Sequence, residues 1–390
     1  MKCIRLLPTL IAFCIAGIGI ANAQKITVSQ KPVSQSNKEA VETDPTTSKG
    51  FGIVSNASGL TITVDGQLFS RYVIDKVNKP YLWPIIGPTG QPMTRAYPME
   101  LLESEKEQRD HPHHRGLLFG HENAGLVGWK YPDSDKEWTA IKKKDRPFAG
   151  GDTWHELATF EDYQKMPKRA VDGHRRPDTL ASIKHREFKQ LVIEGDQAIV
   201  VELCDHVDRD GKRFMSEERR LVFRSSETSR SIDFDQTFTA EDGDIFFDDR
   251  KDAGLGIRVP TSMAIDSKKG GTVINSDGLI DGKAWSKPAK WCDYNGPVEG
   301  EHLGIAFLNH PNSYRFPTRW HVREYGLFTA NPFAMKAFSS KLEDGTTILK
   351  QGESLNLKHR LIFHAGDATT ANIEQAWQQY AKEDTNHESK

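Results

Sequence analysis

Short β-type runs that alternate with turn residues recur along most of this 390-residue chain, and they limit the folds open to it. Residues 60–64 alternate apolar with polar side chains and run into Asp65-Gly66, a strong hairpin signal. Residues 191–193 and 198–201 flank the segment 194–197 and predict a second hairpin. Further strands are expected within 220–224, 231–239, 256–259, 304–308 and 355–363. The pattern predicts a mainly antiparallel β chain.

One helix is expected, close to the C-terminus. Within 372–382, four apolar side chains recur at helical spacing and form one stripe: Ile373, Ala376, Trp377 and Tyr380. We therefore expect an all-β fold, a large antiparallel β-sandwich with a C-terminal helix. The β domain is expected over 51–366, and the helix and tail over 367–390.

The first 23 residues have the pattern of a secretory signal peptide. Lys2 and Arg5 precede an apolar stretch, and Ala21-Asn22-Ala23 is a small-x-small cleavage pattern. The apolar stretch is shorter than the roughly 20 residues that a membrane helix needs. We expect cleavage near Ala23, a disordered polar leader over 24–50, and a periplasmic or secreted protein with no membrane span in the mature chain.

Composition removes other classes of protein. The 52 Lys and Arg residues nearly balance 54 Asp and Glu residues, which argues against a non-specific nucleic-acid binder. Two cysteines, Cys204 and Cys292, lie beyond the signal peptide. An oxidising compartment would allow them to pair, and two separate buried thiols are the alternative.

A block of histidines is the first candidate site. Asp110–Gly116 holds three of the chain's 14 histidines, and His121 follows shortly after. In an extended backbone His111 and His113 would share one face and His114 would point the other way. Pro112 biases His111 away from helix, and Gly116 permits a tight bend. The block offers imidazoles to a metal or to a polar ligand; a satisfied surface loop is the alternative.

The segment Trp320–Gly326 is the second candidate. As a strand it would place His321, Arg323 and Tyr325 on one face and Trp320 on the other. A row of imidazole, guanidinium and phenol suits a cleft that holds hydroxyls or a carboxylate, with Arg323 able to bind in a bidentate manner. An exposed strand face with ion pairs is the alternative.

Two further candidates come from loops. Asp249 lies in the charged run 248–252, which presents carboxylates beside a cation, although such runs are usually solvated turns. Asn331 opens a polar corner, Asn331-Pro332-Phe333, that could rim the same cleft. The sequence has no P-loop, no dinucleotide fingerprint, no His-Glu-x-x-His motif and no Gly-x-Ser-x-Gly elbow, so nothing indicates a nucleotide cofactor or a serine hydrolase.

These motifs together resemble a bacterial family of otherwise unknown function that is labelled PmoA, or "methane oxygenase PmoA". The resemblance covers nearly all of the chain after the leader. It is carried by the runs 79–81, 87–88, 94–99, 110–116, 275–278, 291–297, 320–326 and 331–333. The family in turn resembles galactose-mutarotase-type β-supersandwich proteins, which bind or convert sugars in an open cleft.

The preferred hypothesis is a carbohydrate-processing enzyme of epimerase, mutarotase, lyase or hydrolase type, acting on a carbohydrate or small polar substrate. His113 or His114 would be the base and His321 the acid, because imidazole titrates near ambient pH. The expected supporting residues are Asp249, which would orient a partner, and the substrate-binding Arg115, Arg323, Tyr325, Trp320 and Asn331. The hypothesis requires His113 and His321 to line one cavity.

Two alternatives stay open at this point. The first is a metalloprotein with His111, His113 and His121 as ligands of copper, zinc or iron. The preferred hypothesis predicts no cofactor, so a divalent metal is expected only under this alternative. The second is a glycan-binding module without catalysis.

Overall fold

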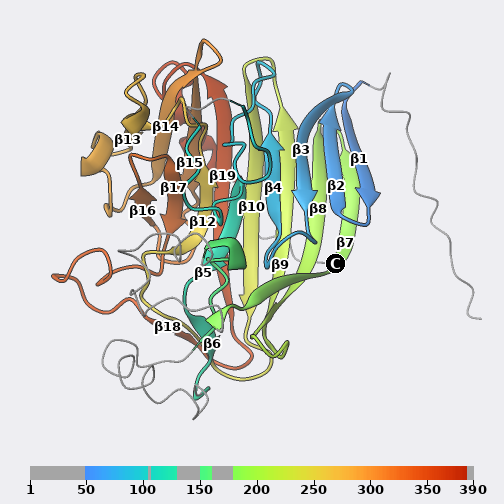
Figure 1. Ribbon diagram of the computed structural model, residues 1–390, viewed down its shortest axis with the longest axis vertical. Helices are drawn as coiled ribbons and strands as arrows, with labels where there is room; N and C mark the ends of the chain where they lie inside the picture. Colours follow the sequence, from blue (N-terminus) through green and yellow to red (C-terminus); the bar gives the residue numbers. More distant parts are fainter. Residues whose placement is uncertain (1–48, 104–106, 130–149, 160–178, 384–390) are drawn as a thin grey trace, which may run out of the picture. The chain divides into compact units, whose positions relative to one another are not determined.

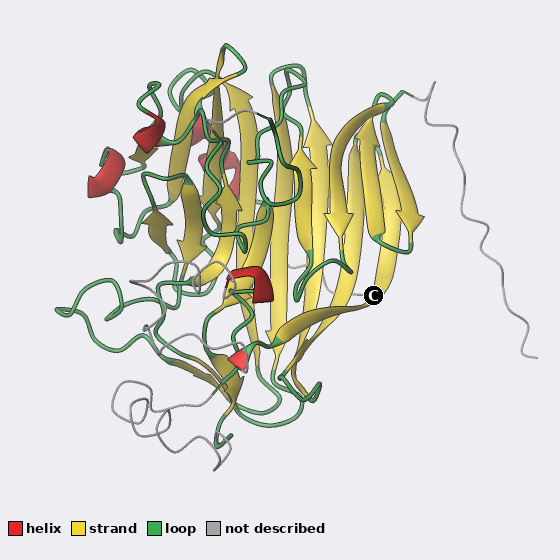
Figure 2. Ribbon diagram, viewed as in Figure 1, coloured by secondary structure: helices red, strands yellow, loops and turns green. Residues whose placement is uncertain are grey.

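Two eight-stranded antiparallel sheets form most of the protein (Figures 1 and 2). The structure is a computed structural model, and it describes residues 49–103, 107–129, 150–159 and 179–383. The expected signal peptide, most of the leader and the last residues of the tail lie outside these ranges. The predicted all-β class with a C-terminal helix is confirmed.

The first sheet has the strand order β1-β2-β3-β4-β5-β12-β17-β16. Its strands are β1 (Phe51–Asn56), β2 (Gly59–Val64), β3 (Gln67–Val73), β4 (Tyr81–Ile85), β5 (Leu117–His121), β12 (Ala253–Arg258), β17 (Leu327–Asn331) and β16 (Arg319–Val322). The predicted Asp65-Gly66 hairpin joins β2 to β3, and both turn residues have positive φ, 50° and 71°. This is the backbone that such a two-residue turn requires.

The second sheet has the order β13-β14-β15-β19-β10-β9-β8-β7. Its strands are β13 (Thr272–Asn275), β14 (Trp291–Val298), β15 (Glu301–Asn309), β19 (Ser354–Ala365), β10 (Ser229–Thr239), β9 (Arg213–Ser225), β8 (Gln197–Val207) and β7 (Ser182–Glu194). The second predicted hairpin joins β7 to β8. A small sheet of β18 (Thr347–Leu349), β11 (Ile245–Phe247) and β6 (Ala124–Leu126) lies beyond one end of the strands in Figure 1.

The core lies between the two large sheets. Aromatic pairs join them along their length: Phe69 with Phe223 at 5.4 Å between ring centroids, Phe119 with Phe238 at 5.0 Å, and Trp320 with Phe307 at 5.4 Å. Burying each such side chain contributes about 1.5–3 kcal/mol. Cys204 and Cys292 are buried free thiols, so the structure does not contain the disulfide between them.

Helices are few among the described residues. Two short 3-10 helices, η3 (Ile265–Ser267) and η4 (Asp281–Lys283), lie in loops, and α3 (Ile373–Tyr380) lies within the predicted helical range. Ile373 and Tyr380 of α3 pack on Trp291 and Leu308 of the second sheet. In the described ranges no helix has the length and apolar character needed to cross a membrane.

Candidate functional site

The histidine block folds as a tight turn. His111 has φ 47°, and the His114 backbone N–H donates to the His111 carbonyl over 3.0 Å. The three rings therefore meet, with centroids 4.3 Å apart for His113 and His114 and 4.9 Å apart for His111 and His114. The expected extended arrangement, with His114 turned away, was wrong because the left-handed residue reverses the chain.

Gly116 makes the bend that the sequence predicted. Its φ is 58°, and a Cβ atom there would lie 2.1 Å from the Leu82 carbonyl oxygen of β4. Only glycine fits such an approach without displacing the backbone. The bend sends the chain from the histidine turn directly into β5.

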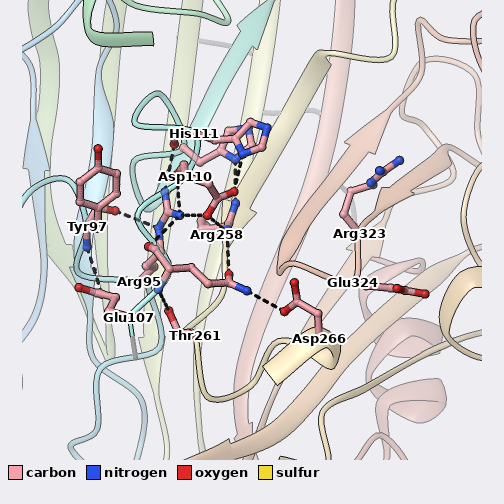
Figure 3. Close-up of polar contacts among 12 residues, drawn as sticks. Arg95, Tyr97, Glu107, Asp110, His111, Arg258, Thr261, Asp266, Arg323 and Glu324 are labelled. Carbon is pink, nitrogen blue, oxygen red and sulfur yellow. Dashed lines mark hydrogen bonds and ion pairs between the residues drawn. The ribbon is translucent and has the colours of Figure 1, made fainter. Parts of the chain in front are cut away.

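Two buried arginines and one carboxylate hold the turn from below (Figure 3). Asp110 Oδ1 accepts hydrogen bonds from Arg95 Nη1 at 3.0 Å and from Arg258 Nη2 at 2.8 Å, and Oδ2 accepts one from His111 Nδ1. Arg95 Nη2 also donates to the His111 carbonyl over 3.0 Å. Burial alone would raise the pKa of Asp110. His111 and the two guanidinium groups lower the pKa by more than burial raises it, so the net pKa lies below its usual value. The carboxylate therefore stays ionised.

This bonding fixes the tautomer of His111. With Nδ1–H donated to an ionised Asp110, the lone pair of a neutral imidazole is on Nε2. Burial lowers the pKa of His111, although Asp110 opposes the change. The imidazole is thus neutral near pH 7, and its side chain is 22% exposed. A neutral, oriented and reachable imidazole can accept a proton.

Tyr325 and Arg323 complete the open part of the site. The Tyr325 ring stacks on His111 at 5.0 Å between centroids and 8° between planes. Arg258 lies over the same phenol ring, with its Cζ 4.7 Å from the centroid. The exposed Arg323 has its Cζ 5.5 Å from that centroid, and Figure 3 shows it to one side of the His111 ring. Imidazole, phenol and guanidinium groups thus lie together at the surface.

His113 and His114 form the buried side of the turn. His113 Nδ1 lies 2.9 Å from Thr159 Oγ1, and its ring centroid is 4.6 Å from that of His155. Arg258 Nη1 donates to His114 Nδ1 over 3.2 Å. Burial and the neighbouring imidazoles lower the pKa of both side chains well below the usual value. We assign to both a supporting role, because each is at most 3% exposed.

An ion-paired layer lies behind these histidines. Arg115 donates to both Glu156 oxygens, Nε at 2.8 Å and Nη2 at 2.7 Å. Lys79 is 1% exposed, and burial lowers its pKa to about 8 even though Glu156 and Asp152 oppose the shift. Because the Arg115 guanidinium is bonded to Glu156, we assign to it a structural role and not the expected contact with substrate. His155 in turn bonds Asp152 through Nδ1 at 2.8 Å.

The second candidate segment divides into two parts. The expected strand through Gly326 was wrong: β16 ends at Val322, and a turn follows in which Gly326 has φ 94° and donates to the Arg323 carbonyl over 2.9 Å. This turn carries Arg323 and Tyr325 to His111. His321 stays behind on β16.

His321 occupies an apolar position of its own. Its Nδ1 donates to the Lys251 carbonyl over 2.7 Å, and its ring lies beside Trp285 and Phe338 at 6.4 and 5.7 Å. Burial lowers the pKa of His321 to about 4. No described contact joins His321 to His113, so the structure does not bring the expected base and acid together.

Three other predicted residues have packing or bonding roles. Asp249 accepts four backbone N–H groups through its carboxylate, at 2.7–3.0 Å: those of Met335, Lys336, Ala337 and Gly345. Trp320 is fully buried between the sheets. Asn331 donates to the Arg250 and Lys251 carbonyls and accepts the N–H groups of residues 333 and 334. The side chains of all three are used within the fold.

The candidate metal ligands do not converge. His121 follows Phe119 by two residues on β5, so its ring faces the core, 5.0 Å from Phe333 and 5.6 Å from Phe247. Its Nδ1 accepts the Asn123 N–H over 3.0 Å. Within the described ranges, no three His, Cys, Asp or Glu side chains are arranged to hold a metal ion. His111, His113 and His121 therefore do not form a set of ligands here.

Sequence reasoning missed Arg95 and Arg258, and in the ion-paired layer it named Arg115 as substrate-binding but missed Glu156, Asp152 and Lys79. Lys79 and Arg95 do lie within motifs that carry the family resemblance, 79–81 and 94–99, but nothing in their spacing relates them to His111. Arg258 closes β12, 147 residues beyond His111, and only the sheet brings it to Asp110.

Several solved structures share a distant likeness with this chain. A galactose mutarotase-like protein from Clostridium acetobutylicum is 11% identical with a TM-score of 0.32, over 81% of this chain and 99% of that one. An alpha-galactosidase from Lactobacillus brevis is 8% identical with a TM-score of 0.37, over 85% and 42%. A GH36 alpha-galactosidase from Geobacillus stearothermophilus is 10% identical with a TM-score of 0.29; the match covers 48% of this chain and only 28% of that protein's length. With TM-scores below 0.5, the likeness assigns no activity to this chain.

No curated protein matches the chain. The resemblance to the PmoA-labelled family stays a prediction from the motifs. A family model does match, and it spans every element from β2 to most of α3, including the histidine turn, Arg258 and Tyr325. Residues 59–378 match the model of DUF6807, a family of unknown function, and the chain belongs to that family.

Proposed function

We propose that the protein binds a carbohydrate over the His111–Tyr325–Arg323 surface and that His111 transfers a proton during its conversion. The observation that carries the proposal is the Asp110–His111 pair: an ionised carboxylate on Nδ1, a neutral ring and a partly exposed side chain. A carboxylate that orients an imidazole in this way is a recurrent arrangement in general acid–base catalysis.

The chemistry needs few steps. His111 Nε2 takes a proton from a substrate C–H or O–H, and the imidazolium that forms is stabilised by Asp110. In an epimerase the proton leaves a C–H next to a carbonyl or carboxylate, and a proton returns to the opposite face of the same carbon. In a mutarotase the proton leaves the anomeric O–H, the C1–O5 bond opens, and the ring oxygen takes up a proton. In a lyase the proton leaves a C–H next to a carboxylate, the β C–O bond breaks, and the departing oxygen takes up the proton; none of these cycles needs a redox partner.

The surface around His111 suits a hydroxyl-rich substrate. Arg323 offers donors in a planar fork to hydroxyls or to a sugar carboxylate. Tyr325 offers a ring and a phenol hydroxyl, and it is held in place by His111 and Arg258. His321 and Asp249 take no part in this proposal, because their polar atoms are used elsewhere. We propose that the protein acts outside the cytoplasm, as the first 23 residues predict.

Deuterium exchange tests the proposal without knowledge of the product. The chain is incubated in D2O with hexoses, hexuronic acids and their short oligomers, and NMR follows deuterium incorporation at carbon and the interconversion of anomers. We expect one substrate class to react, and His111→Gln to lower its rate by about 10²–10⁴-fold. Unchanged rates in His111→Gln would contradict the proposal.

A matched control separates chemistry from folding. His185 on β7 is also a partly exposed histidine, and its Nδ1 bonds the Glu202 carboxylate at 2.7 Å. His185→Gln removes the same kind of pair on a strand that carries no residue of the His111–Tyr325–Arg323 surface, and we expect its exchange rate to match the parent. Saturable sugar binding with no exchange at any position would instead support the glycan-binding module.

A further inference from the structure

A hollow of about 370 Å³ is lined in part by Arg95, the arginine that also bonds the histidine turn. This volume is within the range of small-molecule sites. Its apolar walls include Trp83, Ile86 and Pro260, and the exposed Glu100, Lys269 and Glu299 lie at its edge. The proposed chemistry at His111 makes no use of it.

Trp83 is fixed as one wall of the hollow. Its Nε1 donates to the Arg95 carbonyl over 2.9 Å, and the residue packs against the buried cluster of Tyr81, Leu118, Trp154 and Leu327. The indole is only half-buried although it packs against this cluster. An indole held in place and left partly uncovered is a platform on which the apolar face of a sugar ring can stack.

The hydroxyl groups of the lining have hydrogens to donate. Thr94 Oγ1 accepts the Ile85 N–H over 3.3 Å, and Thr261 Oγ1 accepts the Gln108 N–H over 3.2 Å. Each oxygen is thus used as an acceptor, and neither hydroxyl donates to an acceptor among the residues that the structure describes, so its hydrogen can bond a ligand oxygen. Carboxylates of Glu100 and Glu299 and the ammonium of Lys269 add acceptors and a donor at the edge. A ligand with several hydroxyl groups meets all of these needs.

Arg95 connects the hollow to the proposed reacting centre. The residue lines the hollow, and its guanidinium bonds both Asp110 Oδ1 and the His111 carbonyl at 3.0 Å. We infer that the hollow binds a second sugar ring of the substrate, so that the substrate is an oligosaccharide and not a free monosaccharide. This inference rests on the proposed function.

Binding measured without turnover tests the inference. Calorimetry in the His111→Gln background compares galactose, glucose and galacturonic acid with their linear oligomers of two to four rings. We expect oligomers of the preferred sugar to bind at least tenfold more tightly than the monomer. Trp83→Ala should remove this advantage, a loss of about 1.4 kcal/mol or more, whereas Trp83→Phe should keep most of it.

Variants at the edge of the hollow guard against a folding defect in Trp83→Ala. Lys269 and Glu299 are exposed, so Lys269→Ala and Glu299→Ala leave the core intact, and each should weaken oligomer binding about two- to fivefold. Lys341→Ala, an exposed lysine outside the hollow, is the control. Equal affinity for monomer and oligomer, or full oligomer affinity in the edge variants and in Trp83→Ala, would overturn the inference.

The two proposals fail in different ways. If the parent chain catalyses exchange on monomers and oligomers equally and its binding does not depend on oligomer length, the second-ring inference is wrong and the proposed His111 chemistry stands. If oligomers bind more tightly than monomers, this advantage needs Trp83, and the chain catalyses no exchange, the hollow is a sugar-binding site and the proposed acid–base function is wrong.

Discussion

A single carboxylate, Asp110, decides whether His111 can act as a base. It holds the Nδ1–H tautomer and also raises the pKa of His111 against the larger lowering caused by burial. Asp110→Asn should therefore lower the exchange rate by about 10²-fold or more, because an amide can also stabilise the wrong tautomer. In the parent chain, the rate should stay level as pH falls through 6.5 and decline only where the depressed pKa of His111 is reached. A decline that begins above pH 6.5 would contradict this assignment.

At Asp249 the same type of side chain has a structural role. Its carboxylate accepts four backbone N–H groups from the segment 335–345, a described segment that contains no strand. Asp249→Ala should lower the free energy of unfolding by about 2–4 kcal/mol, because four backbone N–H groups lose charge-assisted bonds to a buried carboxylate. Urea denaturation measures the loss, and exchange per folded molecule should stay at the parent level. A rate falling more than tenfold in folded protein would give Asp249 a part in the chemistry.

The strands and hairpins could be predicted from the local alternation of apolar and polar residues in the sequence, whereas the arrangement of the site could not. The sequence predicts the hairpins at Asp65-Gly66 and at 194–197 because turn chemistry and period-2 alternation act within a few residues. The same alternation failed at Trp320–Gly326, where the turn closed by Gly326 ended the strand early. The bond from Arg258 to Asp110 spans 148 residues and depends on the pairing of β12 with β5, whereas the bond from Arg95 joins two residues 15 apart within the connection between β4 and β5.

One glycine of β5 lets the segment 152–155 lie against the sheet. A Cβ atom at Gly120 would come within 2.9 Å of both the Thr153 carbonyl oxygen and Trp154 Cα. Gly120→Ala should push this segment away and lower stability by about 1–3 kcal/mol, with a loss of exchange because His155 and Trp154 support the histidine turn. Gly282→Ala is the control, because a Cβ there meets only Glu324 Oε1, at 3.8 Å. Equal melting temperatures for both variants would contradict this account.

Buried histidines make the stability of the whole molecule depend on pH. Burial lowers the pKa of His121 and His359 to about 3 and that of His321 to about 4, against 6.5 in the unfolded chain. The unfolded state therefore binds more protons between pH 6.5 and 4, so stability falls as the solution is acidified. Asp235 acts in the opposite direction, since burial raises its pKa to about 7 and the folded state then takes up a proton that the unfolded state releases.

These four groups predict a net loss of stability on mild acidification. Between pH 7 and 5 each histidine costs about 2 kcal/mol and Asp235 returns about 2, leaving a loss of about 3–4 kcal/mol. This is a large part of the 5–15 kcal/mol by which domains are typically stable. Urea titrations at the two pH values should show the loss. His359→Gln should reduce it by about 2 kcal/mol, whereas Asp235→Asn should increase it by a similar amount. If neither variant changes this loss of stability, the protons taken up on unfolding bind to other groups.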